Sequence, residues 1–180
     1  MNRSTLAGGP TQDEIMAVSL LKLGLISTDT VLEIGCGTGK VSVAMAKTAK
    51  KVYALDKRPD AVSLATETAR QAGVRNIEFF CTDALDYFSP GQEWDCAFLG
   101  GTSGLERILP ILAKKVKRTI VINAVMLSTL ERSVTVLKEL GIFCEVVQVQ
   151  VSRSHEIAGS IMFKPIDPVY IIVARGAACS

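Results

Sequence analysis

Apolar residues recur along the chain in short continuous runs that alternate with amphipathic segments. Continuous runs predict strands buried on both faces, and apolar positions three or four residues apart predict helices. The runs place strands at residues 30–34, 51–56, 76–82, 94–99, 118–123, 142–151 and 168–174. Helical spacing occurs at residues 11–25, 39–48, 59–72, 84–88, 104–115 and 126–140.

This order of elements predicts an α/β fold, because alternating strands and helices form a mostly parallel sheet with helices on both faces. No helical pattern fits between residues 151 and 168, so we expect the last two strands to pair antiparallel. The connection at residues 152–167 is expected to be a long loop without secondary structure.

The length of 180 residues predicts a single domain over residues 1–180. Thr11 and Glu14 have the spacing of a capping box, which predicts that the first helix begins at Thr11. We therefore expect a flexible N-terminus at residues 1–10, a helix at 11–25 and the core at 30–175.

Composition narrows the class of protein. No apolar run approaches the roughly 18 residues that cross a bilayer, and the first residues lack the apolar segment of a secretory signal. We expect a cytoplasmic protein that does not bind membranes. The net charge is +2 and no basic run occurs, so nucleic acid is not an expected partner.

The cysteines do not predict a metal site or a disulfide framework. Their number is odd and no C-x-x-C pair occurs, which favours reduced, buried thiols. A metal site is not expected, because His155 is the only histidine. The five cysteines are Cys36, Cys81, Cys96, Cys144 and Cys179.

Three glycines stand at alternate positions between the first strand and its helix. Glycine allows a ligand to approach the main chain, and the helix that follows presents N–H groups at its positive end. A dinucleotide fingerprint has the spacing G-x-G-x-x-G, whereas Gly35, Gly37 and Gly39 give G-x-G-x-G, and Lys40 stands at the third dinucleotide position. The spacing therefore disfavours a pyrophosphate ligand.

The stretch from Glu33 to Gly39, EIGCGTG, resembles the first motif of the class I S-adenosylmethionine-dependent methyltransferases. Seven strands with the last antiparallel is also the architecture of that Rossmann-like superfamily. Asp56, at the end of the second strand about 20 residues after the glycines, can accept hydrogen bonds from ribose hydroxyls. Asp83 and Ala84 end the third strand, where this fold contacts adenine, although Asp83 can instead cap the next helix.

A closer resemblance covers residues 11–174. The N-terminal helix TQDEIMAVSLLKLGL, the segment INAV and the closing MFKPIDPVYIIVA resemble the decarboxylating cobalt-precorrin methyltransferases of corrin synthesis. The loop after the fourth strand, LGGTSG, lacks the N-P-P-Y motif common in methyltransferases of base amines. The family pattern there is close to G-G-S-G-G, so the sequence GGTSG adds bulk to this loop.

This resemblance implies transfer of a methyl group to ring carbon 15 of a cobalt-precorrin, coupled to loss of the ring C acetate carboxyl as carbon dioxide. Neither step requires a metal or a protein nucleophile, so no catalytic residue is nominated. The family also suggests a homotetramer. The implied contacts to S-adenosylmethionine are Thr11, Gly35, Cys36, Gly37, Thr38, Gly39, Asp56 and Ala84.

A tetrapyrrole substrate with many carboxylates calls for cationic groups around its pocket. We expect the 152–167 connection to border the site, with Met162 and Phe163 against the flat ring. Asn123 either orients the substrate or caps the following helix, and Glu33 is expected to hydrogen-bond the loop amides. The candidate substrate residues are Gly100, Gly101, Thr102, Asn123, Arg153, His155 and Lys164.

Three other functions remain open on the sequence alone. The chain could methylate another acceptor, such as an RNA base or a protein carboxylate. It could bind the cofactor without catalysis, because the glycines and Asp56 show only that the binding loop is present. A nicotinamide-dependent oxidoreductase is the third alternative. The order of the two steps, and whether the ring carries cobalt, also remain open.

Overall fold

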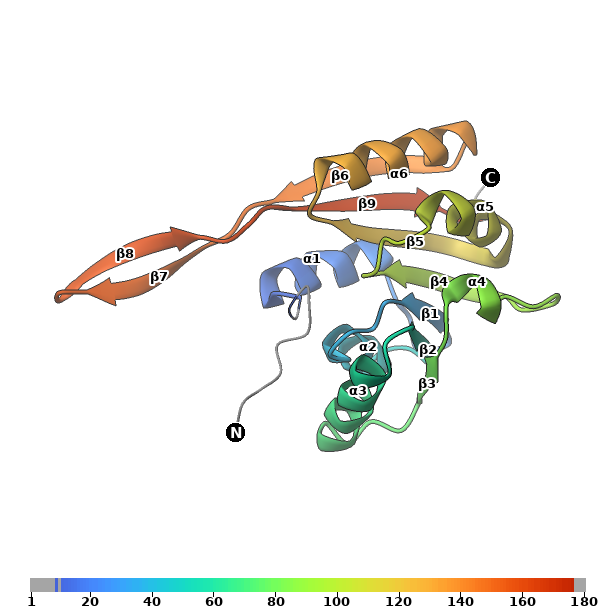
Figure 1. Ribbon diagram of the computed structural model, residues 1–180, viewed down its shortest axis with the longest axis horizontal. Coiled ribbons are helices and arrows are strands. Elements are labelled where there is room, and N and C mark those ends of the chain that lie inside the picture. Colours follow the sequence, from blue (N-terminus) through green and yellow to red (C-terminus); the bar gives the residue numbers. More distant parts are fainter. Residues whose placement is uncertain (1–8, 10, 177–180) are drawn as a thin grey trace.

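The computed structural model describes residue 9 and residues 11–176 (Figure 1). Within this described part, no helix is long and apolar enough to span a bilayer. The elements in chain order are α1 (Asp13–Leu23), β1 (Thr30–Ile34), α2 (Lys40–Ala46), β2 (Lys51–Asp56), α3 (Pro59–Gln71), β3 (Ile77–Cys81), α4 (Ala84–Tyr87), β4 (Trp94–Leu99), α5 (Leu105–Lys115), β5 (Val116–Ala124), α6 (Leu127–Glu139), β6 (Phe143–Val149), β7 (Ser152–Ile157), β8 (Ser160–Pro165) and β9 (Val169–Arg175).

Seven strands form one sheet in the order β3-β2-β1-β4-β5-β9-β6. The first five strands are mutually parallel, and β9 lies antiparallel between β5 and β6. The predicted α/β fold and the antiparallel pairing of the last two strands are confirmed. Because β6 runs in the same direction as β5, its end lies at the same carboxyl edge of the sheet as the glycine loop.

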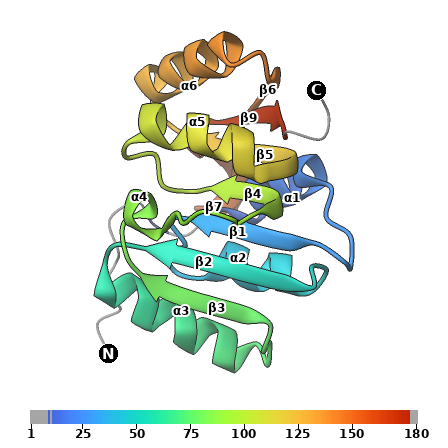
Figure 2. The same cartoon turned by 90° about the vertical axis from the view of Figure 1, so that its right-hand side faces the viewer.

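Two apolar cores cover the two faces of the sheet. One core packs α4, α5 and α6 against the sheet through side chains such as Leu109 and Leu137. The other packs α1, α2 and α3 through side chains such as Leu23, Met45 and Ala65. Helices therefore lie on both sides of the sheet (Figure 2). The prediction of helices on both faces is confirmed.

The prediction that α1 begins at Thr11 is wrong. The helix begins at Asp13 after the N-cap residue Gln12, and no side chain caps it. It ends at Leu23, because Gly24 adopts the left-handed conformation that stops a helix. Asp13 and Glu14 place negative charge in the first turn. This charge interacts favourably with the helix dipole and so stabilises the helix start, which has no side-chain cap.

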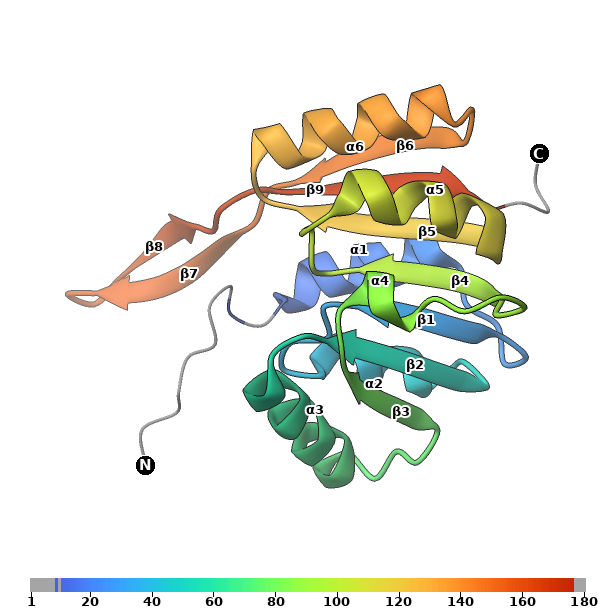
Figure 3. The same cartoon turned by 45° about the vertical axis from the view of Figure 1, so that its right-hand side comes forward.

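The expected loop at residues 152–167 is instead an antiparallel hairpin of β7 and β8 (Figure 3). Ala158 and Gly159 both have positive φ, the geometry of a two-residue hairpin turn. All residues of both strands are exposed, and the hairpin projects away from the main sheet. We refer to residues 152–165 as the projecting hairpin.

The expectation of buried cysteines holds for Cys36 and Cys96 and is wrong for Cys81 and Cys144, which are exposed. Cys81 ends β3 and Cys144 lies on β6, and these are the two edge strands of the sheet. Edge strands have a neighbour on one side only, so their side chains are less covered. All four are free thiols, and Cys179 lies outside the described residues.

Candidate functional site

Loops from several strands meet at the carboxyl edge of the sheet and enclose a cavity of about 280 Å³, which we call the edge cavity. The structure brings six of the predicted site residues together around it, from both the cofactor set and the substrate set. These six are Gly35, Asp56, Ala84, Gly100, Gly101 and Thr102. Asp83 also lines the cavity, and its carboxylate caps α4 by accepting from the Leu85 amide at 3.0 Å.

The three glycines of the loop serve two different purposes. A Cβ on Gly35 would lie 2.4 Å from the Gly101 amide nitrogen, and a Cβ on Gly39 would lie 2.7 Å from Ala65 Cα. These two glycines allow close packing within the protein. Gly37 has a φ of 53°, and a Cβ there would have only Arg58 within 4 Å. The open side of the loop is therefore at Gly37, where a ligand can approach the backbone.

Backbone hydrogen bonds hold the loop against the end of β2. The amides of Gly35 and Cys36 both donate to the Leu55 carbonyl, at 2.8 and 2.9 Å. The Gly37 amide donates to the Asp56 carboxylate at 3.0 Å. The loop and the strand-end acid thus form one rigid unit. These two features fit an adenosyl cofactor. The buried carboxylate can bind the sugar, and the main chain of the glycine loop can lie against the rest of the ligand.

The Asp56 carboxylate accepts several hydrogen bonds at this edge of the sheet. Its side chain is 4 % exposed and accepts hydrogen bonds from the backbone amide, Nε and Nη2 of Arg58, each at 3.0 Å. Burial by itself would raise the pKa of Asp56, but the bonds from Arg58 and Gly37 outweigh burial and hold this pKa below its usual value. The carboxylate is therefore ionised at neutral pH.

Glu33 does not contact the loop amides as predicted. It is buried beneath the loop and accepts a hydrogen bond from the Ser42 hydroxyl on α2. Its side chain points to the face of the sheet that α2 covers, which explains the different partner. Burial raises the pKa of Glu33 to about 7. The hydrogen bond from Ser42 opposes this increase, and the nearby Asp56 charge adds to it.

This raised pKa predicts a pH-dependent stability. Between pH 4.5 and 7 the unfolded chain releases the Glu33 proton while the folded protein keeps it, so stability falls through this window and levels off above it. We expect Glu33→Gln, which mimics the protonated acid, to unfold at higher urea concentration than the wild type at pH 8. The free energy of unfolding of the variant should exceed that of the wild type by on the order of 3 kcal/mol at pH 8, and this difference should vanish near pH 4.5.

Glu67→Gln is the matched control, because hydrogen bonds from Arg70 and Gln71 lower the pKa of this exposed acid to about 2. Glu67→Gln should not raise the free energy of unfolding at pH 8. Parallel stability profiles for Glu33→Gln and the wild type from pH 4.5 to 8 would contradict a buried, protonated Glu33.

The remaining predicted cofactor residues do not line the edge cavity. Cys36 is buried, and burial raises the pKa of its thiol, so it is not a reactive nucleophile. Thr11 lies next to α2, because Lys40 Nζ donates to its carbonyl at 2.9 Å and pairs with Asp13 at 2.8 Å. These contacts hold the start of α1 beside the glycine loop. Cofactor binding by Thr11, Cys36, Gly37, Thr38 and Gly39 stays a prediction.

Asn123 lies at the end of β5 and faces α1. Its Oδ1 atom accepts from the Ser19 hydroxyl at 3.0 Å, while its Nδ2 atom is buried without a hydrogen-bond partner among the described residues. The alternative that it caps α6 is wrong, because that helix begins at Leu127 with Met126 as its N-cap. A buried amide donor without a partner is energetically costly, which makes Asn123 a candidate for ligand contact.

Arg153, His155 and Lys164 lie on the projecting hairpin, away from the edge cavity. They line a second cavity of about 470 Å³ together with Asp167. Arg153 is opposite Lys164 and His155 is opposite Met162, so strand alternation places Arg153, His155 and Lys164 on one face of the hairpin. Met162 and Phe163, as neighbours in one strand, point to opposite faces and cannot both lie against one ring, contrary to the expectation.

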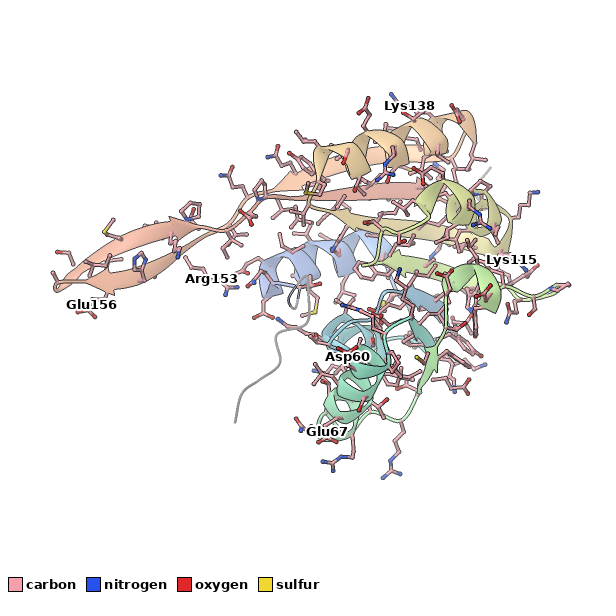
Figure 4. The ribbon with its side chains drawn as sticks, in the orientation of Figure 1. Asp60, Glu67, Lys115, Lys138, Arg153 and Glu156 are labelled. Atoms are coloured by element: carbon pink, nitrogen blue, oxygen red, sulfur yellow. The ribbon has the colours of Figure 1, made fainter. Side chains whose placement is uncertain are left out.

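Arg153 links the projecting hairpin to the rest of the protein. Its Nη2 atom forms an ion pair with Glu14 of α1 at 2.7 Å. Figure 4 labels Arg153 near the hairpin. The first turn of α1 therefore contacts the glycine-loop helix through Lys40 and the hairpin through Arg153. This turn therefore lies between the helix that follows the glycine loop and the hairpin that carries Arg153, His155 and Lys164.

Several residues of the edge cavity were absent from the prediction. Arg58 is the most important of them, and Thr82, Ser103 and Ile108 also line the cavity. The signal for Arg58 was present in the sequence, since a cation two positions after a strand-end acid can fold back onto it. Thr82, Ser103 and Ile108 carry no comparable signal.

Solved structures with the same fold identify the class of protein. The chain aligns with a precorrin-8W decarboxylase from Methanobacterium thermoautotrophicum at a TM-score of 0.90 and 27 % identity, covering 96 % of this chain and 94 % of that one. It aligns with a precorrin-6Y C5,15-methyltransferase from Geobacter metallireducens at a TM-score of 0.88 and 29 % identity, covering 96 % and 93 %. The sheet, glycine loop and strand-end acid are those of a Rossmann-like methyltransferase.

The family model described as a precorrin methyltransferase domain matches residues 6–175, and the chain belongs to this family. A relative from Methanosarcina acetivorans is 43 % identical over 179 residues, covering 97 % of both chains. Another from Methanosarcina mazei is 45 % identical over 177 residues, covering 95 % of this chain and 96 % of the relative. Both are named cobalt-precorrin-6B C(15)-methyltransferase (decarboxylating).

Proposed function

We propose that this protein methylates carbon 15 of cobalt-precorrin-6B and removes the ring C acetate carboxyl as carbon dioxide, in cobalamin biosynthesis. S-adenosyl-L-methionine is the proposed donor. The observation that carries this proposal is the identity of 43 and 45 % to relatives of that name over nearly the whole chain. The edge cavity, with its glycine loop and buried Asp56, supports the choice of donor.

In this proposal the donor's adenosine lies in the edge cavity. Asp56 accepts hydrogen bonds from the ribose hydroxyls, Ala84 contacts the adenine, and Gly37 leaves room for the amino-acid end. The donor, when bound, supplies an electrophilic methyl group. The protein positions this methyl group against the macrocycle, and such positioning can supply a large part of the rate.

The substrate lies along the carboxyl edge between the edge cavity and the projecting hairpin. Gly100, Gly101 and Thr102 border the methyl group. Asn123, whose buried amide has no hydrogen-bond partner among the described residues, is the proposed donor to a substrate group. Arg153, His155 and Lys164 are suited to bind carboxylates of the tetrapyrrole. The sulfur–methyl bond of the donor would break as the bond to carbon 15 forms, with S-adenosylhomocysteine as the leaving group. The electron pair of the broken carbon–carbon bond would remain on the conjugated macrocycle.

Mass spectrometry of the product tests this function. The purified protein is incubated with cobalt-precorrin-6B and a donor that carries a deuterated methyl group. We expect a product that has gained one labelled methyl and lost one carbon dioxide. Methyl gain without loss of carbon dioxide would contradict the decarboxylating assignment. Transfer of the label to RNA or to protein instead would favour another acceptor.

We further propose that the protein is a cytoplasmic homotetramer. Four described cysteines are free thiols, as is usual in a reducing compartment. The projecting hairpin exposes Ile161, Met162 and Phe163, which are 74, 50 and 69 % exposed. A two-stranded hairpin alone is only marginally stable in water, so packing against other copies of the chain would stabilise it.

Substitution of the hairpin tests this assembly. We expect the double variant Ile161→Ser and Phe163→Ser to have a lower molar mass than the wild type in light scattering after size-exclusion chromatography, because its contact surface loses its apolar side chains. Leu21→Ser is the control, since this isolated apolar residue on α1 is 76 % exposed. A monomeric wild type, or a double variant that keeps the tetramer mass, would contradict the proposed assembly.

A further inference from the structure

The carboxylate proposed to hold the donor's ribose is already saturated with hydrogen bonds. Oδ1 of Asp56 accepts from the backbone amide and Nε of Arg58, and Oδ2 accepts from the Gly37 amide and Nη2 of Arg58, all at 3.0 Å. A carboxylate offers about four acceptor positions. The ribose hydroxyls can therefore bind Asp56 in full only if the guanidinium leaves.

The guanidinium also takes up space at the glycine loop. A Cβ added to Gly37 would lie 4.0 Å from Arg58 Nη2, so the arginine tip lies near the open side of the loop. Both Asp56 and Arg58 line the edge cavity. Its volume of about 280 Å³ is just below the range of roughly 300–1,000 Å³ that is typical of ligand sites. Movement of the side chain would enlarge the cavity next to the acid.

The two partners differ in burial. The Asp56 side chain is 4 % exposed and fixed by the loop, whereas the Arg58 side chain is 37 % exposed and reaches solvent. A guanidinium that already reaches solvent can be hydrated when it leaves, so ribose hydroxyls that donate to Asp56 in its place can displace it. Arg58 is the partner that can move.

We propose that Arg58 is a latch that the methyl donor opens. Before the donor binds, its guanidinium occupies the ribose position on Asp56. The ribose hydroxyls displace it toward the mouth of the edge cavity, where it binds a carboxylate of the substrate. This inference rests on the proposed function, and it makes donor binding precede tight substrate binding.

Titration calorimetry with S-adenosylhomocysteine, whose net charge is zero, tests whether the guanidinium of Arg58 competes with the donor for Asp56. We expect Arg58→Met to bind this probe about fivefold more tightly than the wild type, because the competing guanidinium is gone. Arg58→Lys should lie between the two, since lysine keeps the charge without the bidentate geometry. Arg70→Met is the matched control. It removes another arginine from a carboxylate pair, with Glu67 at 2.7 Å, and should leave the affinity unchanged.

Steady-state kinetics test whether the displaced Arg58 then binds the substrate. In Arg58→Met the KM for the donor should fall while the KM for cobalt-precorrin-6B rises, and general damage to the fold would not move the two constants in opposite directions. Unchanged or weaker probe binding in the Arg58 variants would overturn the latch, with Arg58→Lys deciding if Arg58→Met does not fold. A wild type that does not bind the probe would instead overturn the proposed donor site.

Discussion

Replacing Gly35 with alanine is expected to destabilise the protein by about 3 kcal/mol or more and to abolish donor binding. The added Cβ would lie 2.4 Å from the Gly101 nitrogen and 2.6 Å from its Cα. Both contacts are to backbone, so no side-chain rotation relieves them. The loop must move away from the loop after β4, and this movement disrupts the edge cavity. Urea unfolding and calorimetry with S-adenosylhomocysteine measure the two effects.

Gly73→Ala is the matched control for this prediction. Gly73 also has a positive φ, of 70°, but a Cβ there would have nothing within 4 Å. Its substitution should cost only the backbone strain of about 1–2 kcal/mol and should leave donor affinity unchanged. If Gly35→Ala behaved like Gly73→Ala in both measurements, the packing role assigned to Gly35 would be wrong.

Replacing Asp56 with asparagine is expected to weaken S-adenosylhomocysteine binding about 10- to 100-fold, because charge-assisted hydrogen bonds to the ribose are lost. Asparagine has nearly the same shape, so the effect reports the lost charge and acceptor rather than a cavity. The amide also offers only one acceptor oxygen where the carboxylate offers two. Calorimetry with the wild type and the variant at the same pH measures the loss.

Asp60→Asn is the control for Asp56→Asn. Asp60 is an exposed acid in the first turn of α3, near Arg58, and its substitution removes the same charge from the same region. Donor affinity should be unchanged in this variant. An equal loss of affinity in both variants would indicate a general electrostatic effect, and undiminished affinity in Asp56→Asn would remove the carboxylate from the donor site.

The sequence predicted the sheet well because its signals there are strong. Buried parallel strands appear as continuous apolar runs. β2 lies at the predicted residues 51–56, and β5 contains the predicted residues 118–123 and extends beyond them at both ends. The glycine loop was also predictable, because glycines at alternate positions between a strand and a helix are typical of a loop that binds a cofactor. Six predicted site residues consequently meet around one cavity.

The projecting hairpin could not be predicted in the same way. Both faces of β7 and β8 are exposed, so no alternation of buried and exposed positions marks them. Its turn is Ala158-Gly159 and lacks the Asn-Gly or Asp-Gly pair that signals such turns. The spacing of Asp56 and Arg58 allows an ion pair but does not by itself require one. Hydrogen bonds between specific side chains depend on rotamers that no periodic pattern encodes.

A crystal structure of the protein with S-adenosylhomocysteine would test the central claim most directly. We expect the adenine to lie beside Ala84, the ribose hydroxyls to bind the Asp56 carboxylate, and the Arg58 guanidinium to have left that carboxylate. An empty edge cavity at saturating ligand, or a diphosphate bound at the glycine loop in its place, would contradict a methyl-donor site.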